Sequence, residues 1–268
     1  GNTGLGAVDP LQAIVELQRD YEFRIHADAA YGGYFVLADE LRNETRAAYE
    51  QLTAVDSVVI DPHKHGLLPY GCGSVLFKDP SVGALYKHDS PFTYFSSAEL
   101  HLGEISLECS RPGASAVALW ATQQLLPLVP GGEFAAMLDD CLIAAGQFWS
   151  RLQDSTNFVP LMAPELDIVV YAVKAPDSSK ASNRARQVFA AAAERDLHLA
   201  LIELPVRLVQ EYAPGIRADS ETVTCLRSVL MKPEHLGWLE TIVDVLETSA
   251  DAARSRFVTM TGFLVQHD

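Results

Sequence analysis

Asp61-Pro62-His63-Lys64-His65-Gly66 places a lysine between a predicted buried strand and a turn. The apolar run Val58-Val59-Ile60 precedes this stretch, and the turn-forming run Pro69-Tyr70-Gly71-Cys72-Gly73 follows it. A lysine in such a loop can be desolvated, which makes its neutral amine available as a nucleophile. Lys64 is therefore a candidate for imine formation with an aldehyde cofactor, although a surface lysine is the simpler alternative.

A carboxylate lies at the end of an earlier predicted strand. Residues 23–28 form that strand, which enters the turn Tyr31-Gly32-Gly33, and Asp28 is its last residue. An acid at this point can keep a pyridinium nitrogen protonated, and pyridoxal phosphate chemistry needs such a partner as well as an imine lysine. Residues 37–53 supply the helix expected between Asp28 and Lys64. Together these features predict a pyridoxal phosphate site.

Asp28-Ala29-Ala30 followed by His63-Lys64 resembles the pyridoxal-phosphate-dependent group II amino-acid decarboxylases, which include glutamate, aromatic amino-acid and bacterial tyrosine decarboxylases. Residues 1–10, the loop Ser110-Arg111-Pro112-Gly113 and the pair Leu226-Arg227 are similar to further segments of that family, in the same order. The resemblance implies an α/β protein of fold type I, like the pyridoxal-phosphate-dependent transferases. Its incomplete large domain would have a mostly parallel sheet, and a small α/β domain would follow.

The resemblance also implies roles for the residues near the cofactor. Asp28 would pair with the pyridine nitrogen, with a helix cap as the alternative. Ala30 would lie against the ring face, unless it is only a small residue before two glycines. His63 would donate to the cofactor phosphate, the alternative being a packed core histidine. Thr3 would lie near the partner of Asp28 and the substrate carboxylate, or else be an ordinary turn threonine.

Two further residues are candidates for more distant contacts. Ser110 resembles a serine that reaches the cofactor phosphate of the neighbouring subunit, with a helix cap as the alternative. Arg227 interrupts an otherwise apolar predicted strand, where an unpaired guanidinium would be costly to bury. A substrate carboxylate is a suitable bidentate partner for it, and a structural salt bridge is the alternative.

The proton donor for the substrate carbon is less well defined. Tyr94 lies in the expected long loop of residues 81–108 and is the first candidate, while Tyr86 and His88 compete with it. A packed aromatic ring is the alternative role. Relatives with phenylalanine at the corresponding loop position resemble aldehyde synthases, and phenylalanines at 92 and 95 flank the candidate.

The composition narrows the class of protein. The chain has 268 residues, of which 49% are hydrophobic and 21% charged, which is typical of a globular protein. A net charge of −15 argues against nucleic-acid or anionic-membrane partners. The four cysteines form no Cys-x-x-Cys pair, so no metal site is predicted. No apolar run approaches the roughly 20 residues that span a bilayer. We expect a reduced, cytoplasmic protein.

Hydrophobic periodicity predicts alternating strands and helices. The expected domains are a carboxyl-terminal portion of the cofactor-binding large domain (1–130), a linker helix (131–156) and a small α/β domain (157–268). Predicted strands are 23–28, 57–60, 73–77, 167–173, 199–204 and 222–231. Predicted helices are 11–22, 37–53, 114–126, 134–152, 183–195 and a last helix opened by Pro233.

The resemblance predicts decarboxylation of an aromatic or acidic L-amino acid to its amine and carbon dioxide, by a homodimer with its active site at the subunit interface. The chain begins in a glycine-rich turn, without the family's ring-stacking residue or phosphate-binding cup, so we expect the carboxyl-terminal part of a longer enzyme that binds the cofactor weakly when isolated. A truncated or non-catalytic homologue, a carbon–carbon lyase and an aldehyde synthase of the same fold are the alternatives.

Overall fold

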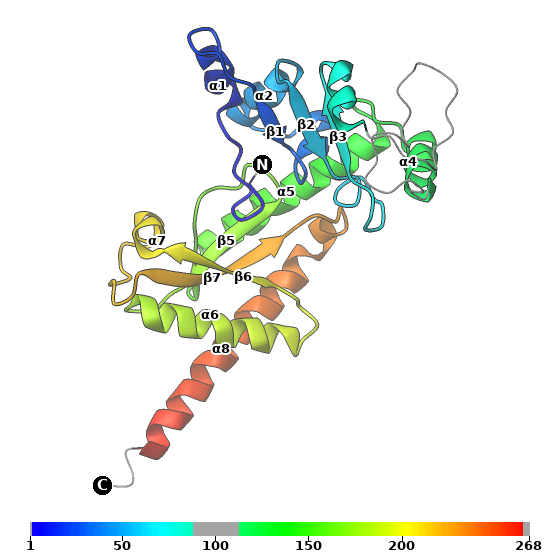
Figure 1. The fold of residues 1–268 in the computed structure, drawn as a ribbon. Coiled ribbons are helices and arrows are strands. Elements are labelled where there is room, and N and C mark those ends of the chain that lie inside the picture. Colours follow the sequence, from blue (N-terminus) through cyan, green and yellow to red (C-terminus); the bar gives the residue numbers. More distant parts are fainter. Residues whose placement is uncertain (1, 88–112, 265–268) are drawn as a thin grey trace. The chain divides into compact units, whose positions relative to one another are not determined.

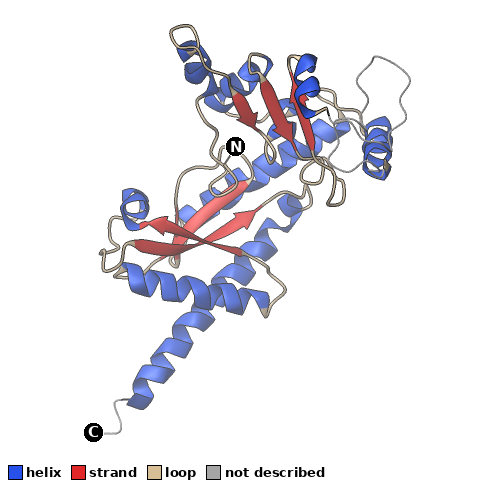
Figure 2. Ribbon diagram, in the orientation of Figure 1, coloured by secondary structure: helices blue, strands red, loops and turns tan. Residues whose placement is uncertain are grey.

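The computed structural model describes residues 2–87 and 113–264 (Figure 1). The chain divides into two units between Phe134 and Ala135, close to the start of a long helix. Two earlier segments, Asn2–Val8 and Ala38–Arg42, belong to the second unit. Both units combine helices with a β-sheet (Figure 2). Among the described residues, no helix has both the length and the apolar character needed to cross a bilayer.

Unit 1 contains a three-stranded sheet in the order β1-β2-β3. Strand β1 runs parallel to β2, with Asp28 opposite Val59, whereas β3 returns antiparallel to β2. The predicted strand at 57–60 and the strand end at Asp28 are both confirmed. The strands are β1 (His26–Asp28), β2 (Ser57–Ile60) and β3 (Ser74–Phe77). The helices are α1 (Leu11–Leu17), η1 (Gly33–Leu37), α2 (Asn43–Glu50), η2 (Gln51–Thr53), η3 (Pro80–Tyr86) and α4 (Ala114–Leu125).

The single helix predicted over residues 37–53 is wrong, because this segment is divided among η1, α2 and η2. The backbone N–H groups of Asp39 and Glu40 donate to Oδ1 of Asp139, at 2.8 and 2.9 Å. These amides, in the gap between η1 and α2, are thus bonded to a distant side chain. The helix predicted at 11–22 also ends early, at Leu17.

Unit 2 contains a four-stranded antiparallel sheet in the order β4-β5-β7-β6. All six residues of β5 are buried, as its continuous apolar run predicts. The strands are β4 (Phe158–Pro160), β5 (Ile168–Val173), β6 (Ala200–Pro205) and β7 (Thr222–Val229). The helices are α5 (Glu133–Gln153), α6 (Ser178–Ala193), α7 (Val206–Tyr212) and α8 (His235–Leu264).

The core of unit 2 lies where α5, α6 and α8 pack against this sheet (Figure 1). Tyr171 of β5 is at its centre and is fully buried. Its ring makes edge contacts with Phe148 and Phe158, with centroids 5.8 and 5.4 Å away. The Tyr171 hydroxyl lies 3.0 Å from Oγ of Ser228, so its polar end is also satisfied.

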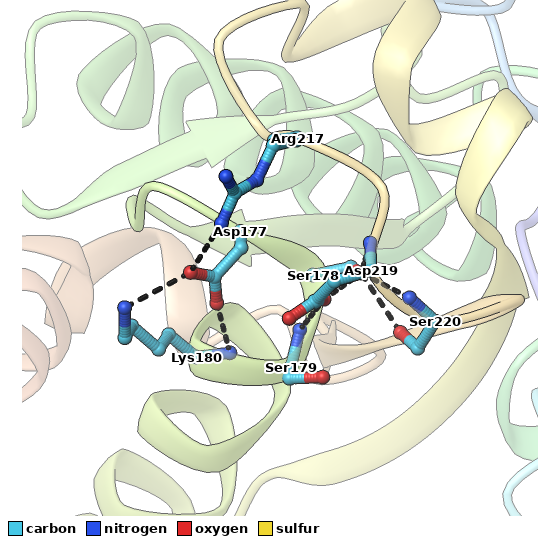
Figure 3. A network of polar contacts seen from close by, with 7 residues as sticks. All are labelled: Asp177, Ser178, Ser179, Lys180, Arg217, Asp219 and Ser220. Atoms are coloured by element: carbon cyan, nitrogen blue, oxygen red, sulfur yellow. Dashed lines mark hydrogen bonds and ion pairs between the residues drawn. The ribbon is translucent and has the colours of Figure 1, made fainter.

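Helix α6 begins five residues before the predicted start at 183, because carboxylates cap its first turn (Figure 3). Asp177 accepts a hydrogen bond from the N–H of Lys180 at 2.9 Å, and Asp219 accepts one from the N–H of Ser179 at 2.8 Å. At the other end of the unit, Pro233 lies in a turn and α8 starts at His235, so the prediction that Pro233 opens this helix is wrong.

Candidate active site

The loop that carries Lys64 is fixed by its own backbone. The N–H of Asp61 donates to the carbonyl of Ala30 at 3.1 Å, so the loop leaves β2 beside the chain that leaves β1. The N–H of Lys64 then donates to the carbonyl of Asp61 at 3.0 Å. Gly66 closes the turn so tightly that an added Cβ would lie 2.7 Å from the carbonyl oxygen of Pro62. The direction in which Lys64 leaves the loop is therefore set by close packing.

His65 anchors the same loop in the core of unit 1. It is buried, and its Nδ1 lies 3.0 Å from the carbonyl of Tyr31, which identifies Nδ1 as the donor. Its ring centroid is 4.7 Å from those of Tyr31 and Phe35. Sequence reasoning assigned no role to His65, although its place beside Lys64 on a short loop was visible.

The Lys64 side chain is 27% exposed and forms an ion pair with Asp61. Its Nζ lies 3.1 Å from Oδ2 of Asp61, whose side chain is 18% exposed. Burial and the negative charge of Asp61 together raise the pKa of the Cys72 thiol. Asp61 is thus the described carboxylate paired with the candidate imine lysine, and sequence reasoning treated it only as part of a motif.

His63 lies beside this pair with one ring nitrogen already bonded. Its Nδ1 is 2.8 Å from the carbonyl of Cys72 and must donate, because a carbonyl oxygen only accepts. Its Nε2 is 3.8 Å from Oδ2 of Asp61. Nε2 can donate to a phosphate only in the imidazolium form, since Nδ1 carries the proton of the neutral ring.

Asp28 and Ala30 lie where β1 ends. Oδ1 of Asp28 accepts a hydrogen bond from the N–H of Ala30 at 3.2 Å, which caps the following turn. Because β1 and β2 are parallel, Asp28 and the Lys64 loop both follow the carboxyl ends of their strands, the usual edge for ligands in such sheets. Asp28, Ala30, His63 and Lys64 are therefore brought to one edge of one sheet.

The structure places Thr3 and Arg227 in unit 2, where they are in contact. Nε of Arg227 donates to the carbonyl of Gly4 at 3.1 Å, and Nη2 donates to the carbonyl of Thr3. The N–H of Val8 donates to Glu165 at 2.6 Å, which ties down the other end of the turn. The described partners of Arg227 are thus backbone carbonyls, whereas the sequence suggested a substrate carboxylate or a structural salt bridge.

Tyr94 and Ser110, together with the competing His88, lie outside the described residues. The structure places the other competitor, Tyr86, at the end of η3, where its ring centroid is 6.3 Å from that of Phe77. It is 58% exposed.

Residues 1–174 match the profile of the pyridoxal-dependent decarboxylase conserved domain. The chain belongs to the pyridoxal-dependent decarboxylase family. Over 175 residues it is 30% identical to the L-aspartate/L-glutamate decarboxylase of Pyrococcus horikoshii, which covers 65% of this chain and 44% of that protein. Over 217 residues it is 28% identical to the L-tyrosine decarboxylase of Enterococcus faecalis, which covers 65% of this chain and 35% of that protein.

The fold is similar to that of TDC from Oryza sativa, solved with PLP and tryptamine. The TM-score is 0.75 at 15% sequence identity, over 94% of this chain and 49% of the rice chain. This similarity confirms the expected fold class. The chain spans about half or less of the length of the decarboxylase-family relatives it matches.

The residues at the carboxyl edge of β1 and β2 fit the family's cofactor. Pyridoxal phosphate requires an amine for its aldehyde and an acidic partner for its ring nitrogen. This edge carries an amine, that of Lys64, on a loop that close packing fixes, and a carboxylate, that of Asp28. The imidazole of His63 lies beside them, with Nδ1 bonded to the carbonyl of Cys72.

Proposed function

We propose that this chain forms part of a pyridoxal-phosphate-dependent decarboxylase that converts an L-amino acid to its amine and carbon dioxide. The observation that carries the proposal is the pair formed by the fixed Lys64 loop and Asp28, at one edge of a sheet in a member of this family. When bound, the cofactor would supply an electron sink for the charge left on the substrate carbon.

Four residues of unit 1 would hold that cofactor. Lys64 would bind its aldehyde, and its amine would be released when the substrate amine takes its place. The Asp28 carboxylate would keep the ring nitrogen protonated, and Ala30 would leave room for the ring face. Nε2 of His63 would donate to the phosphate. Ser110 of a partner subunit would complete the phosphate site, which makes the proposed assembly a homodimer.

Arg227 would bind the substrate carboxylate. A guanidinium has five N–H donors, and the carbonyls of Thr3 and Gly4 take two of them. The remaining N–H groups are sufficient for a bidentate contact with a carboxylate. Thr3 would then lie beside the substrate because Arg227 holds its backbone. Tyr94 would donate the proton that replaces the lost carboxylate.

The relatives favour an acidic or an aromatic amino acid as the substrate, since their names include aspartate, glutamate and tyrosine. We propose a cytoplasmic enzyme. The buried thiols of Cys72, Cys141 and Cys225 support a reducing compartment.

Borohydride reduction of the full natural protein with pyridoxal phosphate, followed by peptide mapping, tests this proposal. We expect the pyridoxyl label on Lys64, and none on this peptide in Lys64→Ala. Asp28→Asn should retain the label but release carbon dioxide far more slowly, because an unprotonated ring is a poor electron sink. A label on Lys78 or Lys87, or equal turnover in Asp28→Asn, would contradict the assignment.

A further inference from the structure

We propose that Asp61 is a positioning residue that holds the ammonium group of Lys64 whenever this lysine is not joined to the cofactor. The inference rests on the proposed function, because it assigns to Lys64 the exchange between a bound and a released form. It adds a residue to the site that neither the motif nor the family comparison singles out.

The first support is the geometry of the pair. Nζ of Lys64 lies 3.1 Å from Oδ2 of Asp61, within hydrogen-bond distance of a charged donor and acceptor. The two side chains are 27% and 18% exposed, so water screens this pair less than it screens a pair on an open surface. The contact joins two residues of one short loop, which lowers the entropy cost of forming it.

The second support is that the carboxylate is itself held in place. The Asp61 N–H is bonded to Ala30, and its carbonyl accepts the N–H of Lys64. Gly73 approaches its other side, where an added Cβ would be 3.3 Å from Oδ1 of Asp61. Both the backbone and the side chain of Asp61 are therefore constrained from β2 and from the turn before β3.

Among the described cationic groups, that of Lys64 lies closest to the Asp61 carboxylate. Nε2 of His63 is 3.8 Å from the same oxygen of Asp61, longer than the Lys64 contact, and its Nδ1 is bonded to the carbonyl of Cys72. A protonated His63 would compete for the carboxylate, but it would be drawn toward a bound phosphate instead.

The chemical consequence follows from the state of the amine. An ammonium has no lone pair and cannot attack an aldehyde, and the Asp61 carboxylate balances the charge of that ammonium at 3.1 Å. Asp61 therefore stabilises the released lysine and keeps it beside the position from which it reattaches.

Competitive reductive methylation of the lysines in the cofactor-free full natural protein tests this role. At neutral pH we expect Asp61→Asn to raise the methylation rate of Lys64 by about 3- to 10-fold, because the ammonium loses its partner. Asp61→Glu keeps the charge and should restore most of the protection. Lys180, whose Nζ is 3.0 Å from Asp177, serves as the internal reference and should not change.

Asp154→Asn is the matched control, because it removes one exposed carboxylate outside the site. An unchanged Lys64 rate in Asp61→Asn would overturn the proposal, and so would an equal rise at Lys180 or in the control. A rise that Asp61→Glu fails to reverse would also overturn it, since it would indicate a disturbed loop. The methylation experiment contains no cofactor. A pyridoxyl label on another lysine in the borohydride experiment would therefore refute the proposed function, but it would not change the methylation result.

Discussion

Substitution of Gly66 by alanine tests whether the turn after Lys64 is as closely packed as described. Gly66 does not have the left-handed backbone seen at Gly6, Gly71 and Gly131, so the substitution adds no backbone strain. Its added Cβ would instead meet the Tyr34 hydroxyl at 2.6 Å and two backbone atoms of Pro62 at 2.7 Å. All three distances are shorter than a normal contact.

The cost follows from which atoms must move. Two of the three atoms belong to the backbone of Pro62, so a change of side-chain rotamer cannot relieve these contacts. The third is the hydroxyl of Tyr34, which is itself buried. Overpacking of this kind costs about 1–3 kcal/mol. Since 1.4 kcal/mol is a factor of ten, opening of the loop should become roughly 5- to 150-fold more frequent.

Hydrogen exchange measured on peptides from residues 57–77 gives the readout. We expect faster exchange there in Gly66→Ala, and unchanged exchange in peptides of β5 and β7. Gly146→Ala is the control, because the residue is in α5 and its added Cβ would meet no described atom within 4 Å apart from the neighbouring backbone of that helix. The free energy of unfolding of Gly146→Ala should rise by about 0.5–1 kcal/mol. Unchanged exchange at 57–77 in Gly66→Ala would refute the close packing of the loop.

Two further predictions concern unit 2. Arg227→Lys keeps the charge but loses the fork that bonds to Thr3 and Gly4, so the amides of residues 2–8 should exchange faster; unchanged exchange there would count against the clamp. Hydrogen bonds from Lys180 lower the pKa of Asp177, and hydrogen bonds from Ser178 and Ser179 lower the pKa of Asp219. The two carboxylates therefore stabilise α6 above pH about 4, and this stabilisation is lost as the pH falls through the lowered pKa values. Protection factors at the start of α6, corrected for the intrinsic pH dependence of amide exchange, should fall over that acid range, and less steeply in Asp219→Asn. Identical profiles would contradict the assignment.

Most of the strands could be predicted because their signal is local. The run Val58-Val59-Ile60 and the fully buried β5 are apolar, and turn-forming residues bound them. The helix predicted at 37–53 failed for a reason that local periodicity does not contain, since Asp139 lies 100 residues from the amide of Asp39 that it binds. The short elements β4 and α7 were not predicted, although β1, β2 and β3, with three or four residues each, were.

The candidate site likewise combines residues that the sequence could predict with contacts that it could not. Lys64 and Asp28 stand out as chemical groups at the ends of predicted strands. The partner of Arg227 could not be predicted, because backbone carbonyls have no sequence signature. Asp61 could have been found, since a carboxylate three residues before a loop lysine is within reach of its amine.

The turn of residues 2–8 makes unit 2 discontinuous along the chain. Its contact with Arg227 closes a loop of more than 200 residues, and the contact of Gly6 with Ile168 closes one of more than 150. Such closures are slow to form, because a long chain must lose entropy before the contact stabilises it. During synthesis, residues 2–8 must wait for β5 and β7 to emerge. A ribosome paused before β7 would therefore expose a nascent chain in which the turn of residues 2–8 still lacks its contact with Arg227.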